Sequence, residues 1–188
     1  LEQLALDELR WVPTSQPWYK SRELTAPAHR LAMVALAVAD EPRFTIDARE
    51  LERAGPSYTL DTVIEMQTES LARMAAPGPE GEGAPAAPPP LPPAEWFLVI
   101  GQDQLAMFHT WHGWQALVSR VTLAVAGRAG EPPALSPELQ GAPLKLVEIA
   151  MPPMDVSSTE IRACIAAHRS LAGLVPDAVA SYIARHGL

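Results

Sequence analysis

The segment 157–162 (Ser-Ser-Thr-Glu-Ile-Arg) combines a helix start with side chains that suit a polyphosphate. Ser157 followed three residues later by Glu160 is the pattern of a capping box, which predicts that a helix begins here. The free amides and the positive dipole end of a helix start attract anions. Two hydroxyls and a guanidinium lie in the first turns: Ser158, Thr159 and Arg162. The segment therefore predicts a phosphate site, and the alternative is an ordinary capped surface helix.

Two more polar side chains follow predicted strands. Lys20 comes shortly after the apolar run 9–12, and Asp103 comes two residues after Gly101, which follows the apolar run 96–100. In an open α/β sheet, ligands bind beyond the carboxyl ends of the strands. Lys20 is therefore a candidate phosphate contact, and Asp103 is a candidate acceptor for ribose hydroxyls. The alternatives are a solvated loop lysine and a carboxylate that caps the following helix.

Aromatic residues are densest in the segment 109–114 (His-Thr-Trp-His-Gly-Trp). Two tryptophans three residues apart normally both belong to the core. Two histidines at the same spacing invite a metal interpretation, but no cysteine or acidic cluster accompanies them, so the sequence does not favour it. The other possibility is a tryptophan face that stacks on a flat heteroaromatic ring.

The elements that must position these residues alternate between strands and helices. Apolar runs and period-two alternation predict strands at 9–12, 43–50, 96–100, 121–126 and 144–149. Helical periodicity predicts helices at 25–40 and 60–74, after 157 and after 176, and the end of a helix at 1–9. The expected caps are Thr25 for the first of these, and Ser57 or Thr59 for the second. The alternation indicates an α/β fold, a doubly wound, Rossmann-like parallel sheet, within a single domain spanning 1–188.

Composition narrows the class of partner. Of the 188 residues, 48% are hydrophobic and 19% charged, and no apolar run approaches the roughly 20 residues that span a bilayer. The net charge of -8 argues against a nucleic-acid binder and favours a small-molecule ligand. The single cysteine, Cys164, favours a packing role in a reducing compartment. With no signal peptide visible, we expect a cytoplasmic protein.

Residues 75–93 differ from the rest of the chain, with eight prolines, three glycines and almost no large apolar side chain. Such a segment cannot offset its ordering entropy by burial, so a disordered surface loop is expected. A tolerated insertion is the favoured interpretation, and a proline-rich docking segment is the alternative.

With these segments in order, the sequence resembles the bacterial nicotinate-nucleotide adenylyltransferases, which belong to the HIGH-motif nucleotidyltransferase superfamily. The resemblance covers nearly the whole chain apart from 75–93. It rests on Arg-Leu-Ala-Met at 30–33, Gly-Pro-Ser-Tyr-Thr-Leu-Asp-Thr at 55–62, Gly-Gln-Asp at 101–103, the aromatic segment at 109–114, Asp-Val-Ser-Ser-Thr-Glu-Ile-Arg at 155–162, and the tail 175–183.

The resemblance implies transfer of AMP from ATP to nicotinate mononucleotide, giving deamido-NAD and pyrophosphate, with Mg²⁺ accompanying ATP. It implies phosphate stabilisation by Lys20 and Arg162, without a side-chain nucleophile. Further ATP contacts would come from Asp103, Ser158, Thr159 and Arg128. The pyridine nucleotide would meet Tyr58, Thr59, Trp111 and His112, with Trp111 stacking on the ring and the amides of Thr59 and His112 receiving the carboxylate. Nucleic acid and membrane are not expected partners, and the expected state is a monomer or homodimer.

Two departures from the family pattern matter. Its G-x-F-D-P-x-H-x-G-H segment has no match in residues 1–188 and is expected just upstream of Leu1, so the 188-residue chain alone is expected to have little adenylyltransferase activity. Ala129 stands where the family commonly has proline, which affects the rigidity of that loop. Two alternatives stay open: an adenylyltransferase for another phosphate acceptor, and a non-catalytic nucleotide- or partner-binding module.

Overall fold

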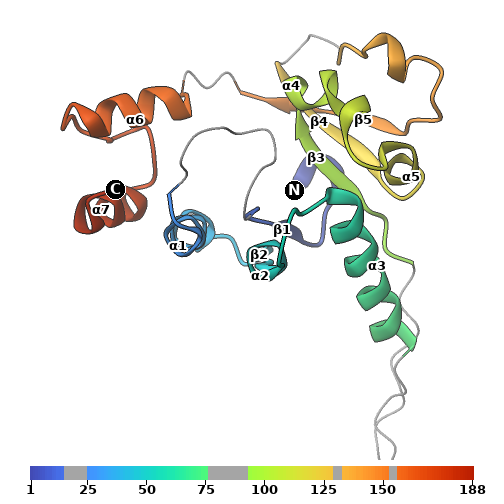
Figure 1. The fold of residues 1–188 in the computed structure, drawn as a ribbon, viewed down its shortest axis with the longest axis horizontal. Coiled ribbons are helices and arrows are strands. Elements are labelled where there is room, and N and C mark those ends of the chain that lie inside the picture. The colour runs from blue at the N-terminus through green and yellow to red at the C-terminus, as the bar shows by residue number, and fades with distance from the viewer. Residues whose placement is uncertain (15–24, 76–92, 129–132, 153–155) are drawn as a thin grey trace, which may run out of the picture. The chain divides into compact units, whose positions relative to one another are not determined.

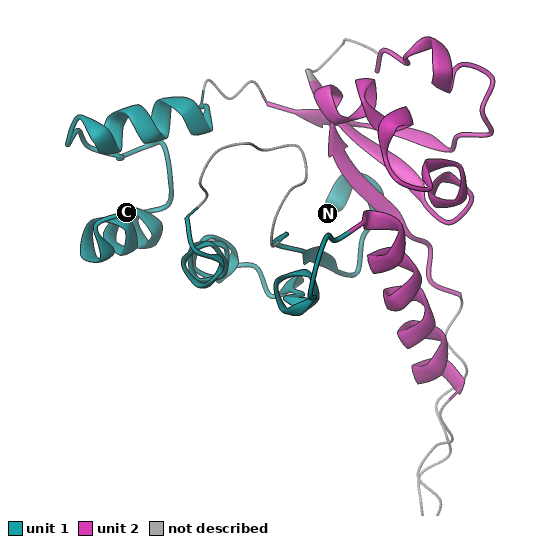
Figure 2. Cartoon of the chain, viewed as in Figure 1, with its two compact units in different colours: residues 1–57, 153–188 teal, residues 58–152 magenta. Residues whose placement is uncertain are grey.

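A computed structural model describes residues 1–14, 25–75, 93–128, 133–152 and 156–188. The chain divides into two compact units (Figure 2). Unit 1 comprises residues 1–57 and 153–188, and unit 2 comprises residues 58–152.

In the part of unit 1 that the structure describes, there are a two-stranded parallel sheet and four α-helices (Figure 1). Strand β1 (Leu9–Trp11) pairs with β2 (Phe44–Ile46), with Leu9 opposite Phe44. Parallel strands need a crossover connection, and helix α1 (Pro27–Val38) lies between them in the chain. The other helices are α2 (Arg49–Glu52), α6 (Ser158–Ala166) and α7 (Asp177–His186).

The core of unit 1 joins α6 to α7. Its buried members are Cys164, Leu171, Val179 and Ile183. Helix α1 joins this packing through Met33. A hydrogen bond of 2.9 Å between His29 Nδ1 and the Tyr182 hydroxyl also links α1 to α7. Packing of these amphipathic faces, more than intrinsic propensity, stabilises such short helices.

Unit 2 is built on a three-stranded parallel sheet in the order β3-β4-β5 (Figure 1). Its register places Val99 opposite Ala124, and Ala124 opposite Val147. The strands are β3 (Phe97–Gly101), β4 (Thr122–Arg128) and β5 (Leu146–Met151). The helices are α3 (Thr59–Ala75), α4 (Gln102–Ala106) and α5 (Trp114–Val118), with 3-10 turns η2 (Phe108–Thr110) and η3 (Pro137–Leu139).

One face of this sheet carries the core of unit 2. Successive strand residues alternate between faces, which places Leu98, Ile100, Leu123 and Val125 on the core side. The fully buried residues that cover this face are Leu105, Phe108, Leu117 and Leu139. Burying each such side chain stabilises the fold by about 1.5–3 kcal/mol. The core therefore anchors the short elements α4, η2, α5 and η3.

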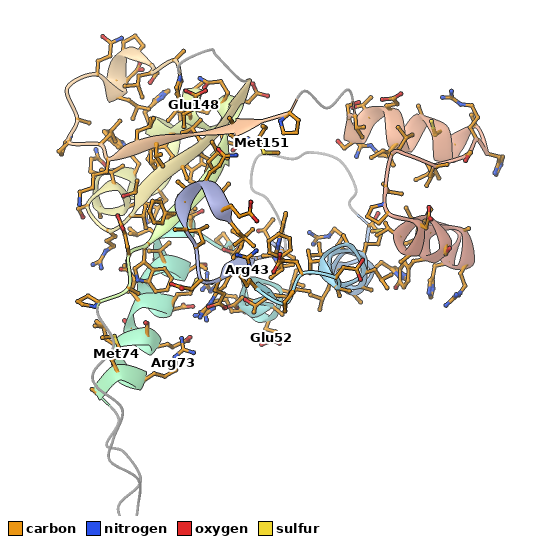
Figure 3. All side chains as sticks on the ribbon, turned by 180° about the vertical axis from the view of Figure 1, so that it is seen from behind. Arg43, Glu52, Arg73, Met74, Glu148 and Met151 are labelled. Carbon is orange, nitrogen blue, oxygen red and sulfur yellow. The ribbon has the colours of Figure 1, made fainter. Side chains whose placement is uncertain are left out.

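Helix α3 is amphipathic. Val63 and Met66 are buried, whereas Leu71 in its last turns is 63% exposed. Figure 3 labels Arg73 and Met74 at the end of this helix. The loop predicted at 75–93 lies mostly outside the described residues. Its first residue, Ala75, is the last residue of α3.

The predicted α/β class and parallel strands are confirmed, and most element positions agree with the sequence analysis within a few residues. The helix expected at 1–9 is wrong: this segment has one 3-10 turn, η1 (Glu2–Leu4), which ends at Ala5 in a left-handed conformation with φ 50°. The single-domain assignment stays a prediction. Within the described ranges, no helix is long and apolar enough to cross a membrane.

Asp47 ends the second strand earlier than predicted. The expected strand at 43–50 stops at Ile46, and α2 begins at Arg49. The Asp47 carboxylate accepts hydrogen bonds from the Arg49 amide at 3.1 Å and from its guanidinium at 2.7 and 2.8 Å. Aspartate side chains that bond to nearby amides offer the backbone an alternative to a strand ladder.

Two predicted helix caps are also wrong. Helix α1 begins after Ala26, with Pro27 in its first position, so Thr25 lies one residue outside the cap. The Ser57 hydroxyl donates to the carbonyl of Glu50 at 3.5 Å, and Thr59 is itself the first residue of α3. In the first case the fixed φ of proline sets the helix start without a side-chain cap.

Candidate functional site

The predicted helix start at Ser157 is confirmed. Ser157 has extended backbone angles, and its Oγ accepts a hydrogen bond from the Glu160 amide at 3.1 Å. Its carbonyl accepts from the Ile161 amide at 3.0 Å. An α-helix leaves its first amides unpaired, and those of Ser158 and Thr159 donate to no other described residue. This end of α6 therefore presents two backbone donors.

Arg162 completes a donor cluster at the same end. Its Nη2 lies 3.1 Å from Ser158 Oγ and 3.5 Å from Thr159 Oγ1. All three side chains are exposed. The guanidinium, two hydroxyls and two amides together can bind several oxygens of a phosphate chain, because each donor favours negative charge. The structure thus brings together the three residues that the sequence predicted for phosphate.

A second group of predicted residues meets in unit 2. The rings of Tyr58 and His112 lie 4.4 Å apart, tilted by 32°. Thr59 begins α3 directly after Tyr58. The amides of Thr59 and His112 donate to no other described residue, so both are available to a ligand. The stack brings the start of α3 next to the turn that precedes α5.

Gly113 holds this arrangement in place. It adopts a left-handed conformation with φ 64°, which side-chain-bearing residues rarely do, and it is the cap residue before α5. A Cβ at this position would overlap Leu60 Cδ2. The turn at His112 and Gly113 therefore lies directly against the first turn of α3.

Trp111 ends the turn η2 in an extended conformation. Its ring lies 5.2 Å from that of Phe108, and it packs against the edge of the unit 2 core while part of its surface stays accessible. The two sequence interpretations of this tryptophan are thus compatible: one side packs inward, and the rest can meet a ligand.

Asp103 lies in the first turn of α4, immediately beyond the carboxyl end of β3. The cap position is occupied by Gly101, so the alternative in which Asp103 caps this helix is wrong. The carboxylate is exposed. The strand-end position expected of a ribose acceptor is confirmed, while its role stays a prediction.

Some predicted site residues are not described. Lys20 lies outside the described residues. The backbone of Arg128 pairs with Met151 at the end of β4 and β5, and the side chain of Arg128 is not described. Figure 3 labels Met151, which is 39% exposed, on β5. The candidate phosphate-binding residues belong to unit 1; they are Ser158, Thr159 and Arg162. The candidate pyridine-binding residues belong to unit 2, as does Asp103; they are Tyr58, Thr59, Trp111 and His112.

Arg30 has a role that sequence reasoning missed. Its Nη1 donates to the carbonyl of Thr14 at 2.6 Å, and its Nε donates to the carbonyl of Thr25 at 3.0 Å. One guanidinium thus binds both residues that flank 15–24, the segment with Lys20. The available signal was an arginine in the first turn of a helix that follows a long connection.

The carboxylates with shifted pKa values lie mostly away from these groups, beside β1 and β2. Hydrogen bonds from Arg49 hold the pKa of Asp47 below its usual range. Hydrogen bonds from Arg43 lower the pKa of Glu41 to about 2. Glu8 raises the pKa of Arg10 through a side-chain hydrogen bond. These pairs support the sheet and do not touch the candidate ligand groups.

The described residues contain no group of three histidine, cysteine or acidic side chains that could hold a metal ion. Mg²⁺ prefers oxygen ligands and is often held by one or two carboxylates together with substrate phosphates. The groups described at the start of α6 are hydroxyls, amides and a guanidinium, which suit phosphate oxygens.

Comparisons with known proteins agree with this geometry. Residues 1–164 match the cytidylyltransferase-like family model. A probable nicotinate-nucleotide adenylyltransferase of Methylibium petroleiphilum is 44% identical over 186 residues, which is 99% of this chain and 78% of that protein. A protein of the same description from Albidiferax ferrireducens is 40% identical over 196 residues, which is 100% of this chain and 85% of that protein.

Solved structures show the same fold. The nicotinic acid mononucleotide adenylyltransferase of Plasmodium falciparum, complexed with NaAD, has a TM-score of 0.65 at 16% identity. The match covers 97% of this chain and 82% of that chain. The chain therefore belongs to the cytidylyltransferase-like family and, within it, to the bacterial nicotinate-nucleotide adenylyltransferases.

Proposed function

We propose that the protein transfers AMP from ATP to nicotinate mononucleotide, giving deamido-NAD and pyrophosphate, as a step of NAD biosynthesis. The relatives at 34–44% identity support this activity through their names. The observation that carries the proposal for this chain is the stacking of Tyr58 on His112, because it brings the start of α3, with the Thr59 amide, next to the turn that carries Trp111 and the His112 amide.

These amides suit a carboxylate on a flat ring. Two N–H donors at Thr59 and His112 can bind the two oxygens of a carboxylate, while Trp111 offers a face for the ring. The amide of nicotinamide carries one oxygen and an NH₂ group, which cannot accept a hydrogen bond. The site therefore favours the acid form of the pyridine nucleotide.

Ser158, Thr159 and Arg162 support the other half of the proposal. In the reaction, a phosphate oxygen of the mononucleotide attacks the α-phosphorus of ATP. The bond from this phosphorus to the bridging oxygen breaks, and pyrophosphate leaves with its electrons. Arg162 with the first amides of α6 would stabilise the negative charge that accumulates on the leaving group. Asp103 would hold the adenosine ribose.

Positioning and charge stabilisation supply most of the rate in such a transfer, so no side-chain nucleophile is needed. Lys20 and Arg128 are proposed as further phosphate and adenosine contacts. Mg²⁺ would enter with ATP and screen the charge of its phosphates. We propose that the two units work as one nucleotidyltransferase domain, in a cytoplasmic enzyme that is a monomer or a homodimer.

Pyrophosphate release by the full-length gene product tests the proposal. It should be measured with ATP and each of three acceptors: nicotinate mononucleotide, nicotinamide mononucleotide and phosphopantetheine. We expect the acid to be preferred. Equal rates with the acid and the amide would contradict carboxylate recognition, and release only with phosphopantetheine would indicate a different acceptor. Nucleotide binding without any release would favour the non-catalytic alternative.

A further inference from the structure

Polar side-chain contacts connect the segment 133–139, which lies between β4 and β5, to the segment 102–109. Gln102 Nε2 donates to the carbonyl of Ala134 at 3.1 Å. His109 Nδ1 lies 3.3 Å from Ser136 Oγ and 3.9 Å from a carboxylate oxygen of Glu138. All five residues belong to unit 2. The two segments are thus tied at both ends of α4 and η2.

Ser136 and Glu138 both lie beside His109 Nδ1. Hydrogen bonds from the backbone amide of Glu138 and from the Ser136 hydroxyl keep the pKa of Glu138 below its usual range, so this carboxylate is ionised at neutral pH. A serine hydroxyl has one proton to donate. The same hydroxyl oxygen lies within hydrogen-bond distance of His109 Nδ1, so Ser136 links the histidine to the carboxylate.

The segment 102–109 needs such contacts to fix its orientation. Helix α4 has five residues and η2 has three, and helices this short are not stable alone. Leu105 and Phe108 anchor one side of the segment in the core, where both are fully buried. Gln102 and His109 hold it on the side of 133–139 and thereby set its rotation about the core anchors.

We propose that Gln102 and His109 are positioning residues for the two ligands, an inference that rests on the proposed function. Gln102 is adjacent to Asp103, the candidate ribose acceptor. His109 lies two residues before Trp111 and three before His112, the candidate pyridine contacts. Gln102 therefore acts on ATP through Asp103, and His109 acts on nicotinate mononucleotide through Trp111.

A purely structural role predicts something different. Leu139 is fully buried and anchors the segment 133–139 without help from polar bonds. The tied side chains are only partly buried, so their loss should change the unfolding midpoint little. If Gln102 and His109 had only a structural role, their substitution would lower the melting temperature without changing KM for one substrate more than KM for the other.

The test uses the full-length gene product and four variants. Gln102→Met keeps the length of the side chain but removes the donor. His109→Ala removes the ring, and His109→Asn restores a hydrogen-bonding side-chain amide near the position of Nδ1. Gln115→Met is the matched control, because Gln115 is exposed on α5 and is assigned no role here. For each protein, KM for both substrates, kcat, the melting temperature and the Kd for a non-hydrolysable ATP analogue are measured.

We expect Gln102→Met to raise KM and Kd for the adenine nucleotide about fivefold, with KM for nicotinate mononucleotide and kcat nearly unchanged. His109→Ala should raise KM for nicotinate mononucleotide and leave KM and Kd for the adenine nucleotide nearly unchanged. His109→Asn should bring KM for nicotinate mononucleotide most of the way back to the wild-type value. Equal changes in both KM values, a change in melting temperature alone, or no recovery by His109→Asn would overturn the inference.

The proposed function can fail separately. If the wild type binds the ATP analogue but releases no pyrophosphate with nicotinate mononucleotide, the proposed function is wrong. The Kd values then decide the Gln102 part of the inference, and an unchanged Kd in Gln102→Met overturns it. A wild type that binds no nucleotide overturns both.

Discussion

The ring of Tyr58 lies 4.4 Å from the ring of His112, across a sequence separation of more than fifty residues. This contact joins the start of α3 to the turn before α5, and both segments belong to unit 2. Because each segment also carries an amide that donates to no other described residue, the stack forms part of the proposed pyridine site.

Trp111→Ala should raise KM for nicotinate mononucleotide much more than KM for ATP. Loss of one stacked ring costs about 1–3 kcal/mol, which corresponds to roughly 5- to 150-fold. Steady-state kinetics with each substrate varied in turn will measure the difference. Trp114→Ala, at another tryptophan that packs against the core, is the control and should lower stability without such selectivity. Equal KM changes in Trp111→Ala would assign this residue to the core alone.

Arg162→Met should reduce kcat/KM for ATP about 10- to 100-fold, because a charged donor is lost from the phosphate cluster. Stability should change little, since Arg162 is exposed. Kinetics and urea unfolding of the same samples will compare the two effects. Arg169→Met, an exposed arginine just after α6, is the control and should leave kinetics unchanged. An unaffected Arg162→Met enzyme would remove this residue from the site.

Two substitutions of Ser157 separate helix capping from anion binding. Ser157→Ala should destabilise the protein by about 1 kcal/mol, because the Glu160 amide loses its acceptor. Ser157→Asp should keep the stability of the wild type, since aspartate is also a good helix cap. It should weaken the binding of ATP, because it places a carboxylate beside the phosphates. Urea titrations and KM for ATP test both statements. Normal ATP affinity in Ser157→Asp would mean that phosphates do not bind at this helix end.

Gly113→Ala should weaken the binding of nicotinate mononucleotide and lower the stability of the protein. Both Gly113 and Gly187 have a left-handed φ, 64° and 62°, but only at Gly113 would a new Cβ meet an atom, Leu60 Cδ2. Gly187→Ala is therefore a matched control for the backbone cost, which is about 1 kcal/mol. Melting temperatures and KM values of the two variants give the comparison. Identical behaviour would show that Leu60 moves aside without disturbing the turn.

Stability should depend on pH through Asp47. Its pKa is lower in the folded protein than in the unfolded chain, because Arg49 donates to the carboxylate. The stabilisation is therefore complete above the unfolded pKa and is lost as pH falls through the folded pKa. Asp47→Asn should lower the urea midpoint at pH 7 and approach the wild type in strong acid. The control is Glu52→Gln, at an exposed residue of α2 that Figure 3 labels. A difference between Asp47→Asn and wild type that persists in acid would contradict this origin.

Local patterns in the sequence predicted the elements and one half of the site well. The strand at 96–100 and the cap at Ser157 depend on neighbouring residues, so apolar runs and a capping box were enough to place them. Asp47 shows the limit of periodicity, because a side chain that bonds to the backbone two residues later ended a strand whose alternation continued.

Long-range contacts could not be predicted in the same way. Nothing in the local pattern of Tyr58 indicates that it stacks on His112, and nothing around Gln102 indicates the carbonyl of Ala134 as its partner. Such contacts depend on how the core places separate segments. Arg30 is a further example, because its guanidinium donates to the carbonyls of Thr14 and Thr25, which lie on opposite sides of a ten-residue segment.

The buried position of Cys164 makes this chain's sole thiol a natural reporter of local opening. The thiol is 5% exposed within the packing of α6 and α7, so a thiol-reactive reagent can modify it only when these helices separate transiently. Labelling rates at increasing reagent concentration would give the free energy of that opening without any mutation. A nucleotide that binds at the start of α6 would slow the labelling in proportion to its occupancy.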